Sequence, residues 1–454
     1  MRQRDYLAVR ALGSLRPSDV AGKPVLVRVD YNVLDDQGNI VSDLRLRASV
    51  PTVRRLAKEL RARVVLISHA GRPQALIQKR AEAEGGNADQ IRREVFSALS
   101  MRPVAGRLAA ILREEGVADG VGFVPDCGGP GVRRAVADLA PGDVILLENC
   151  RFPISSLDTG KSRDEMGDPA LARAMVEDTG AAAYVLDGFS VCHRDHASVT
   201  GLARELKHLE PTAPSVAGAL LQRELEVLFR DLGEDVQRPY VAVVGGAKVS
   251  GKAGKLGLLR ALAGRADMIV VGGAMLYPFL LAQGFTVGAD PLGRDAGEVS
   301  ADVEAATALL EEAGKRIRLP TDIVVEDCGQ AARLDVRTDV CPPGARLRDV
   351  QPEAIERILD ELGRVGALVW NGPVGKFEEP RFAAGTGALV RRMMALTQET
   401  GTTTVAGGGD SEAFLRAHAP GALTALSHVS TGGGAMLAAL AGQRLPGVEA
   451  LDLQ

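Results

Sequence analysis

The stretch "YVAVVGGAKVSGKAGK", residues 240–255, is an apolar run that ends in two glycines and a lysine-rich turn. Apolar runs of this kind, without alternation of apolar and polar residues, are typical of strands buried on both faces of a parallel sheet. Gly246, Gly251 and Lys252 have the spacing of a phosphate-binding loop, G-x-x-x-x-G-K, but Ala253 stands where that loop needs Ser or Thr for Mg²⁺. The stretch predicts a strand followed by a glycine turn, and it leaves open which kind of phosphate site the turn forms.

The same pattern recurs along the whole chain, because short apolar runs alternate with segments of helical periodicity. The strand-like runs of the first half are 24–31, 63–69, 143–149 and 182–188, with helical segments at 50–60, 102–116 and 168–178. Those of the second half are 240–246, 268–273, 322–327, 367–373 and 402–410. This alternation predicts an α/β fold with doubly wound parallel sheets.

A long amphipathic segment at 217–235 separates the two halves. We therefore expect an N-terminal domain at 1–216, a linker helix at 217–233 and a C-terminal domain at 234–429. Ligands of open α/β sheets bind beyond the carboxyl ends of the strands. Two such domains whose strand ends face each other would form an interdomain cleft. The charged, Gly- and Asn-interrupted region 74–98 is expected to be an exposed insertion with some helix.

Composition excludes several classes of protein. The chain has 454 residues, a formal net charge of −4 and an ordinary hydrophobic content of 46%, so no global positive field would recruit nucleic acid. Its five cysteines are an odd number without a C-x-x-C pair, which favours reduced thiols and a cytoplasmic protein. The N-terminus carries no apolar signal. Residues 268–289 are uncharged, but their glycines and proline indicate a strand, turn and helix better than a membrane span. No coiled-coil pattern is evident, so a monomer is expected.

In the second half, every strand end carries a feature suited to a nucleotide. Lys248 and Lys252 lie four apart, and a ribose hydroxyl could bind Glu378. Backbone N–H groups at the start of the helix after 402–407 could hold phosphate, with Asp410 on Mg²⁺. The remaining features are the glycines and the amide of these turns: Gly272, Gly273, Asn371, Gly408 and Gly409. Each element alone is weak, since a turn glycine or a helix-capping Asp is common, but together they indicate a nucleotide site.

The strand ends of the first half carry cations instead. They are Arg45, His69, Arg72, Arg151, His193 and Arg194, with Asp30 and Asn32 among them. Arginine binds phosphate or carboxylate through two parallel hydrogen bonds, which lysine cannot match. A single arginine is usually a surface or ion-pair residue, and a single histidine is usually structural. Four arginines at separate strand ends nevertheless indicate a small, multiply charged anion such as a phosphorylated acid.

At these residues the chain resembles the phosphoglycerate kinase family. "VRVDYNV", "SHAGRP", "LLENCRF", "HRDHAS", "GGAKVS", "WNGPVGKFE", "GGGD" and "STGGGAM…LPGV" occur in the family's order. The resemblance runs from Val25 to Val448, apart from the insertion near 74–98. It implies two Rossmann-like domains, one for phosphoglycerate and one for the nucleotide, with a tail from about 430 to 454 that packs back on the first domain. It also implies hinge-bending between the domains and a role in glycolysis.

The resemblance also implies a role for each matching residue. Those of the phosphoglycerate site are Asp30, Asn32, Arg45, His69, Arg72, Arg151, His193 and Arg194. Those of the Mg-nucleotide side are Gly246, Lys248, Lys252, Gly272, Gly273, Asn371, Pro373, Glu378, Gly408, Gly409, Asp410 and Ser411. The glycine turn at 245–252 then corresponds to the family's lysine-bearing turn. Gly251 stands where the family usually has Asp, so the match to a phosphate-binding loop is accidental.

The reaction implied is reversible phosphoryl transfer between MgATP and the carboxylate of 3-phosphoglycerate, which makes 1,3-bisphosphoglycerate and ADP. A carboxylate is already ionised at neutral pH, so catalysis needs positioning and charge neutralisation rather than a general base. We expect Arg45 and Lys248 to face the transferred phosphoryl group, Lys252 to follow the nucleotide phosphates, and Asp410 to hold Mg²⁺. Replacing Lys248 by Ala is expected to abolish most activity while nucleotide binding is kept.

The chain departs from the family's pattern at several positions around the site. Gly251 replaces Asp, Lys376 stands where a small apolar residue is usual, and Ser190, Val191 and Cys192 lie beside the substrate arginines. Two alternatives therefore remain open at this point. One is a divergent paralogue that acts on a related phospho-carboxylate, and the other is a weakly active nucleotide-binding scaffold.

Overall fold

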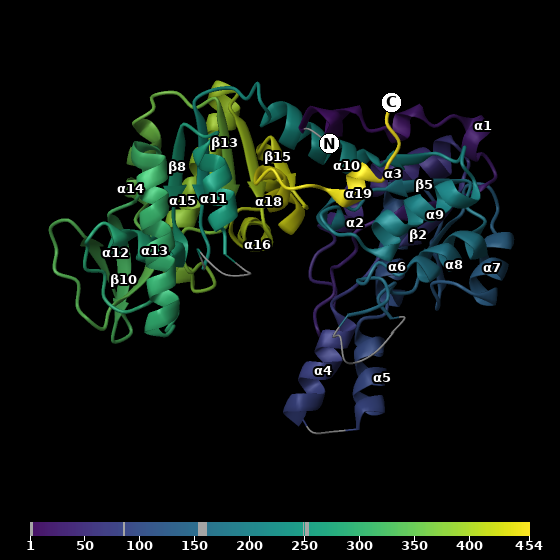
Figure 1. Cartoon of the computed structure of the whole chain (residues 1–454), viewed down its shortest axis with the longest axis horizontal. Helices are drawn as coiled ribbons and strands as arrows, with labels where there is room; N and C mark the ends of the chain where they lie inside the picture. The colour runs from purple at the N-terminus through teal and green to yellow at the C-terminus, as the bar shows by residue number, and fades with distance from the viewer. Residues whose placement is uncertain (1–2, 85–86, 153–160, 248, 250–253) are drawn as a thin grey trace. The chain divides into compact units, whose positions relative to one another are not determined.

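The chain folds into two compact units in the computed structural model, which describes residues 3–84, 87–152, 161–247, 249 and 254–454. Unit 1 spans Met1–Glu226 and Arg444–Gln454, and unit 2 spans Val227–Gln443. Figure 1 shows both, with short 3₁₀ and π-helical turns labelled η in the text.

Unit 1 is built on a six-stranded parallel sheet with the order β3-β4-β2-β1-β5-β6. Its strands are β1 (Pro24–Arg28), β2 (Arg63–Ile67), β3 (Gly122–Val124), β4 (Val144–Leu147), β5 (Ala183–Leu186) and β6 (Ser215–Ala217). Every residue of β4 and β5 is buried, because helices cover both faces of the sheet. The described part therefore has the predicted doubly wound architecture.

The helices of unit 1 lie before, between and after these strands along the chain. They are η1 (Gln3–Ala8), η2 (Leu12–Ser14), α1 (Pro17–Val20), α2 (Leu44–Ala48), α3 (Val50–Val53), η3 (Arg54–Glu59), α4 (Pro73–Glu84), α5 (Ala88–Ala98), α6 (Arg102–Glu114), α7 (Pro130–Ala137), α8 (Pro169–Thr179), η4 (Phe189–Val191), η5 (Ala197–Gly201), α9 (Leu202–Leu209), α10 (Ala219–Leu225) and α19 (Pro446–Glu449).

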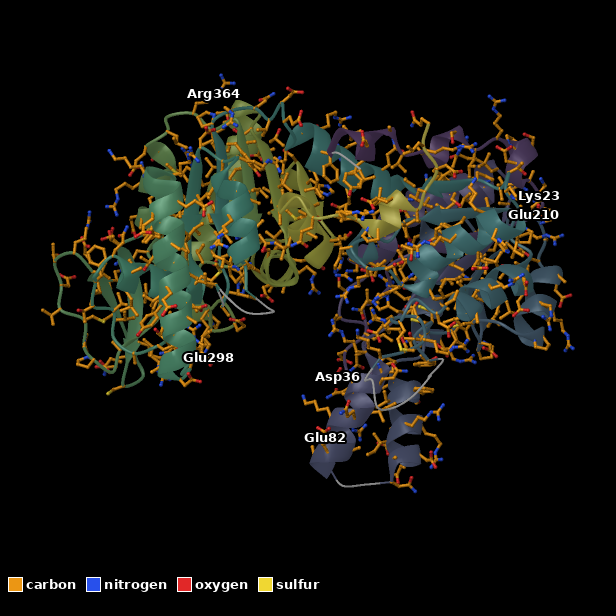
Figure 2. The ribbon with its side chains drawn as sticks, viewed as in Figure 1. Lys23, Asp36, Glu82, Glu210, Glu298 and Arg364 are labelled. Atoms are coloured by element: carbon orange, nitrogen blue, oxygen red, sulfur yellow. The ribbon has the colours of Figure 1, made fainter. Side chains whose placement is uncertain are left out.

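The insertion near 74–98 forms two helices, α4 and α5, that lie side by side and project from the rest of unit 1 (Figure 1). Glu82 on α4 is exposed (Figure 2), while Ile77, Ile91 and Val95 belong to the hydrophobic core of unit 1. Residues 88–114 have the length and composition of a membrane span. They form α5 and α6, and the core burial of both helices accounts for their apolar side chains.

Unit 2 contains a second six-stranded parallel sheet, with the order β15-β14-β13-β7-β8-β9. Its strands are β7 (Tyr240–Val244), β8 (Met268–Val271), β9 (Ile317–Arg318), β13 (Ala367–Asn371), β14 (Thr403–Gly407) and β15 (His428–Ser430). Its helices are η6 (Glu226–Asp231), which begins at the boundary, α11 (Leu256–Ala263), η7 (Gly273–Met275), α12 (Leu276–Ala282), α13 (Ala296–Ala313), η8 (Gly314–Arg316), α14 (Pro352–Asp360), η9 (Pro380–Phe382), α15 (Ala384–Thr400), α16 (Gly409–His418), α17 (Ala422–Ala425) and α18 (Gly434–Leu440).

The apolar pattern of residues 322–327 had suggested a strand of the parallel sheet, but this run does not join it. Residues 322–327 are β10 (Asp322–Asp327), which pairs antiparallel with β11 (Gln330–Asp335) and β12 (Arg346–Val350). The reason is a tight turn at Cys328 and Gly329, both with positive φ, which reverses the chain directly after β10. The strand is also only partly buried, as expected for a sheet with one face toward solvent.

The division between the units falls inside the segment expected to link two domains. Helix α10 continues into η6, and the boundary lies between Glu226 and Val227. The tail that belongs to unit 1 begins at Arg444, whereas the sequence had suggested a start at about 430. Its last residues pair with the first ones, since Val9 and Leu453 form an antiparallel bridge.

Candidate functional site

The predicted anion-binding residues of unit 1 follow four strands that are neighbours in the sheet: β4, β2, β1 and β5. The carboxyl ends of neighbouring parallel strands meet at one edge, which brings these residues together. A separate polar cavity of about 470 Å³, lined by Lys23 and Glu210 (Figure 2), lies where the strands begin and contains none of them.

Asp30 organises the end of β1. Its Oδ2 accepts a hydrogen bond from Arg45 Nη1 at 2.5 Å and another from the Ser190 hydroxyl, while the backbone N–H of Asn32 donates to Oδ1 at 3.1 Å. Burial alone would raise the pKa of Asp30, but Arg45, Ser190 and the Asn32 N–H together hold it below its usual range. Asp30 therefore stays ionised and fixes the guanidinium of Arg45 on helix α2.

His69, which follows β2, is buried next to a second arginine, Arg28. Arg28 is fully buried, donates from Nη2 to His69 Nδ1 at 3.0 Å and from Nε to Ser198 Oγ at 2.9 Å. Burial, then Arg151 and Arg28, lower the pKa of His69 well below its ordinary value. A neutral ring that accepts at Nδ1 carries its proton on Nε2, where it can donate to an anion.

The turn after β2 is tied to the turns after β1 and β4. Asn32 Oδ1 accepts from the Gly71 N–H at 2.8 Å, and Arg151 Nη1 donates to the Gly71 carbonyl at 2.5 Å. Gln74 Nε2 donates to the Arg151 carbonyl at 2.9 Å. These bonds fix the backbone beside Arg72, whose own side chain is exposed.

Three arginines interact at this edge. Burial and the charges of Arg72 and Arg151 lower the pKa of Arg194, so the guanidinium groups are close enough to repel one another. Arg151 has a carboxylate neighbour in Glu165, at 3.8 Å. Burial and Arg194 lower the pKa of His193 to about 4, and its Nε2 accepts from Arg194 Nε at 3.1 Å. This concentration of positive charge suits a small anion with more than one negative charge.

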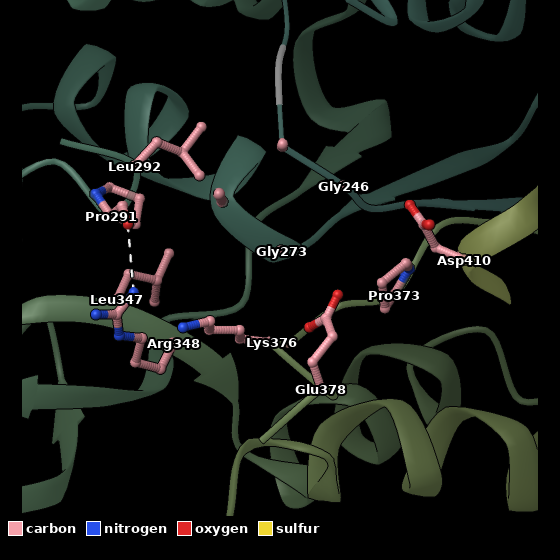
Figure 3. A pocket seen from close by; sticks show the side chains of 13 residues that line it. Gly246, Gly273, Pro291, Leu292, Leu347, Arg348, Pro373, Lys376, Glu378 and Asp410 are labelled. Carbon is pink, nitrogen blue, oxygen red and sulfur yellow. Dashed lines mark hydrogen bonds between the residues drawn. The ribbon is translucent and has the colours of Figure 1, made fainter. Parts of the chain in front are cut away.

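In unit 2, a cavity of about 430 Å³ opens at the carboxyl ends of β7, β8, β13 and β14, which are neighbours in the sheet (Figure 3). The predicted nucleotide residues that line it are Gly246, Gly273, Pro373, Glu378 and Asp410. The sequence had not pointed to a second group of lining residues, which comes from the segments before α13 and on β12: Pro291, Leu292, Leu347 and Arg348. Apolar side chains at one end and glycine turns with a carboxylate at the other suit a ligand that is flat at one end and charged at the other.

The glycines at these strand ends are required by close packing. Gly273 has a φ of +67°, and a Cβ there would lie 2.7 Å from the Gly246 nitrogen. A Cβ at Gly272 would lie 2.6 Å from the Val374 side chain, and one at Gly408 would lie 3.0 Å from Asn371 Nδ2. Side chains at these positions would fill the space between neighbouring strand ends.

Asn371 and Ser411 join neighbouring strand ends through hydrogen bonds. Both are buried; Asn371 Nδ2 donates to the Gly407 carbonyl at 2.9 Å, and Ser411 Oγ accepts from the Gly372 N–H at 2.8 Å. Gly409 and Asp410 begin the ten-residue helix α16. A carboxylate at this position can hold Mg²⁺ when phosphate oxygens complete the coordination, as is usual for this ion. Among the described residues no group of three or more His, Cys, Asp and Glu side chains could hold a metal.

Two predicted catalytic residues, Lys248 and Lys252, lie outside the described residues, as does Gly251. The same loop contributes Lys255, which the sequence did not single out. Its Nζ donates to the Gly245 carbonyl at 2.7 Å, the Asn371 carbonyl at 3.0 Å and Asn371 Oδ1 at 2.6 Å. Lys376 lines the cavity and pairs with Glu379 at 2.6 Å, which with Arg381 lowers the pKa of Glu379 to about 2.

The chain is similar to known proteins along nearly its whole length. The family model described as "Phosphoglycerate kinase" matches residues 15–443. A cytosolic phosphoglycerate kinase of Triticum aestivum is 38% identical over 449 residues, covering 98% of each chain. That of Microcystis aeruginosa is 37% identical over 447 residues, covering 98% of this chain and 99% of its own.

Solved structures agree with these relatives. The phosphoglycerate kinase of Pyrococcus horikoshii has a TM-score of 0.77 at 28% identity, and that of Coxiella burnetii has a TM-score of 0.72 at 30% identity. Each match covers 97% of this chain and 98% of the other.

Proposed function

The chain belongs to the phosphoglycerate kinase family, and we propose that it transfers a phosphoryl group between MgATP and the carboxylate of 3-phosphoglycerate. It is a phosphotransferase with a carboxyl group as acceptor. The observation that carries the proposal at the level of residues is the cluster of Arg72, Arg151 and Arg194 beside a neutral His69. Such a cluster matches an acceptor that bears both a phosphate and a carboxylate.

In this proposal, unit 1 binds phosphoglycerate and unit 2 binds the nucleotide. The arginine cluster binds the phosphate of the acceptor, and His69 Nε2 donates to one of its oxygens. Arg45, held by Asp30 and Ser190, is directed at the reacting carboxylate and the transferred group. The apolar residues Leu292 and Leu347 contact the base, and the turns at Gly246 and Gly273 follow the phosphates.

The chemical step needs no general base. An ionised carboxylate oxygen of the acceptor forms a bond to the γ-phosphorus, the bond from that phosphorus to the β,γ-bridging oxygen breaks, and ADP leaves. The protein's part is to align the two ligands and to offset negative charge, through Arg45 and, as we propose, through Lys248 and Lys252. Mg²⁺, held by Asp410 and the nucleotide, would supply further positive charge at the phosphates.

The donors belong to two units, so the reaction requires the bound ligands to approach each other. We therefore expect hinge-bending that also excludes water and limits hydrolysis of ATP. Relatives that include a cytosolic plant enzyme and a bacterial enzyme support a cytoplasmic protein. We expect it to act as a monomer on small molecules, without nucleic acid or membrane.

The test is capture of the acyl phosphate by hydroxylamine. Purified protein with MgATP and 3-phosphoglycerate should yield hydroxamate, and omission of either ligand should abolish it. Arg72→Met should raise the KM for phosphoglycerate by about ten-fold or more, since a charged hydrogen bond is lost. Arg173→Met, an exposed arginine on α8 that pairs with Glu177, is the matched control. Absence of hydroxamate from protein that binds MgATP would contradict the proposal.

A further inference from the structure

Lys255 is a half-buried cation beside the glycine turn of the nucleotide cavity. It comes from the loop between β7 and α11, and its three hydrogen bonds join the end of β7 to the end of β13. A lysine ammonium has three N–H donors, so these acceptors use all of them. The ammonium therefore acts on a ligand through its charge and through the backbone that it holds.

The positive charge of Lys255 is not balanced by an ion pair in the described part of the chain. Asp410, at the start of α16, attracts it without approaching to ion-pair distance, and all its bonded partners are neutral. Burial lowers the pKa of Lys255 to about 8, and Asp410 opposes that shift. A partly desolvated cation with neutral partners costs free energy, which a ligand with negative charge would offset.

The ammonium lies at the charged end of the cavity. A Cβ added to Gly246, which lines the cavity, would lie 3.3 Å from Lys255 Nζ, and one added to Gly372 would lie 2.7 Å from it. In Figure 3, Pro373 and Asp410 lie on the right and Leu347 and Arg348 on the left, with Gly246 at the top between them. Negative charge on a ligand at the Gly246 side would therefore lie close to the ammonium.

We propose that Lys255 is a positioning residue for the phosphate chain of the nucleotide, which it attracts across the Gly246 turn while it fixes that turn against Asn371. The inference rests on the proposed nucleotide function of unit 2. It adds a third lysine to Lys248 and Lys252, one that the ligand does not touch.

A consequence is that phosphate binding is linked to protonation of Lys255. A bound polyanion stabilises the charged ammonium and raises its pKa, so the nucleotide complex takes up a proton where the lysine of the ligand-free protein has lost it. Affinity for ADP should therefore fall as pH rises above about 8. Among the described residues, the other charged groups at the cavity are Asp410 on α16, Glu378 and Lys376 after β13, and Arg348 on β12.

The experiment compares ADP with adenosine, which has no phosphate, by titration calorimetry in the presence of a chelator. The full chain is titrated from about pH 7 to pH 9.5. The phosphates of ADP stay ionised over this range, because the second pKa of a phosphate group is about 6. The variants are Lys255→Met, Lys255→Arg and the control Lys315→Met, an exposed lysine of unit 2.

For the wild-type protein and Lys315→Met, the Kd for ADP should rise about ten-fold over this range, while the Kd for adenosine stays constant. Lys255→Met should bind ADP about ten-fold more weakly at pH 7, without the pH dependence, and adenosine as the wild type does. Lys255→Arg should keep tight ADP binding at every pH in this range, since arginine stays charged.

Each contrary result has a distinct meaning. Wild-type protein that binds neither ADP nor adenosine would overturn the proposed nucleotide site and this inference with it. If the wild type binds ADP but its affinity is independent of pH, or if Lys255→Met weakens adenosine as much as ADP, the charge role is wrong and the lysine is only structural. Should Lys255→Met fail to fold, the wild-type and Lys255→Arg titrations decide the question.

Discussion

Arg45 is the residue of unit 1 whose charge we expect to matter most in the transition state. Asp30 and Ser190 orient it, so the cost of positioning its guanidinium is met before substrate binds. Arg45→Met should lower kcat by about 10²–10³, the usual effect of removing one donor to developing negative charge.

Steady-state kinetics at saturating substrate would measure this. Arg47→Met is the matched control, because Arg47 lies on the same helix α2 and pairs with Asp43 and Glu114. A kcat of Arg45→Met equal to that of the wild type would remove Arg45 from the catalytic set.

His193 should make the protein sensitive to acid. Its pKa of about 4 in the folded protein lies below the ordinary 6.5, so the folded state binds fewer protons than the unfolded state between these values. The free energy of unfolding should therefore fall as pH falls from about 6.5 to 4. His193→Asn should lose fewer degrees of Tm than the wild type between pH 7.5 and pH 4.5, with exposed His208→Asn as the control. Equal losses of Tm would contradict the assignment.

Single residues differ in how far their sequence context predicts them. The arginines of unit 1 could be predicted because each follows a recognisable strand. Arg28 could not, since it is the last residue of an apolar strand and gives no sign that it reaches His69. Lys255 was hidden for another reason: its acceptors include both oxygens of Asn371, distant in the sequence, and only the pairing of β7 with β13 brings them near.

At the level of elements, a buried aspartate caps the helix that leads out of unit 1. Asp187, after β5, accepts from the backbone N–H groups of Leu220 at 2.9 Å and Leu221 at 3.4 Å in the first turn of α10. Burial raises its pKa to about 7. Because this value exceeds the ordinary 3.8, the folded state holds an extra proton between the two values, and this contribution to stability is lost as pH rises toward 7.

Asp187→Asn should therefore gain Tm relative to the wild type as pH rises from about 4.5 to 8, since the amide keeps the capping oxygen without the charge. Asp168→Asn is the contrasting control. Asp168 caps helix α8, and a hydrogen bond from Arg163 lowers the pKa of Asp168, so replacing this carboxylate should reduce Tm slightly at neutral pH. Melting curves across this pH range, followed by circular dichroism, would measure both effects. A wild-type advantage at Asp187 that grows with pH would refute the argument.

The inner strands of both parallel sheets were predictable because burial on two faces leaves an unbroken apolar run. The edge strands β3, β6, β9 and β15 were not predicted, because each is only two or three residues long and leaves no such run. β10 shows a second limit of that signal. Its run reads like the others, but whether a strand joins the main sheet depends on the next turn, and the positive φ of Cys328 could not be foreseen from a residue type that seldom adopts it. The cavity wall at Pro291 and Leu347 was missed for a similar reason, since these residues belong to no recognisable strand-end motif.

For the molecule as a whole, the C-terminal segment is expected to stabilise unit 1 alone. Leu445 and Val448 are fully buried, and Asp452 accepts from the Ser215 N–H at 2.9 Å and pairs with Lys207 at 3.0 Å. A buried apolar side chain contributes about 1.5–3 kcal/mol, so deletion of residues 445–454 should lower the melting temperature of unit 1 by several degrees or more.

Trp370 provides the means to separate the two units. It is the single tryptophan of the chain and is fully buried in unit 2, so its fluorescence reports on that unit. After the deletion, the transition seen by circular dichroism should begin well below the one seen by fluorescence. Asp452→Ala is the milder variant and should separate the transitions less. Coincident transitions in the truncated protein would show that the segment does not act on unit 1 separately.

The bridge between Val9 and Leu453 also bears on how the protein is made. A ribosome releases the chain from its N-terminus, so the segment that completes unit 1 emerges only after all of unit 2. Unit 2 is one continuous stretch and can fold while synthesis continues, whereas unit 1 must wait for its final residues. The part of the molecule that is translated first is therefore the last to be finished.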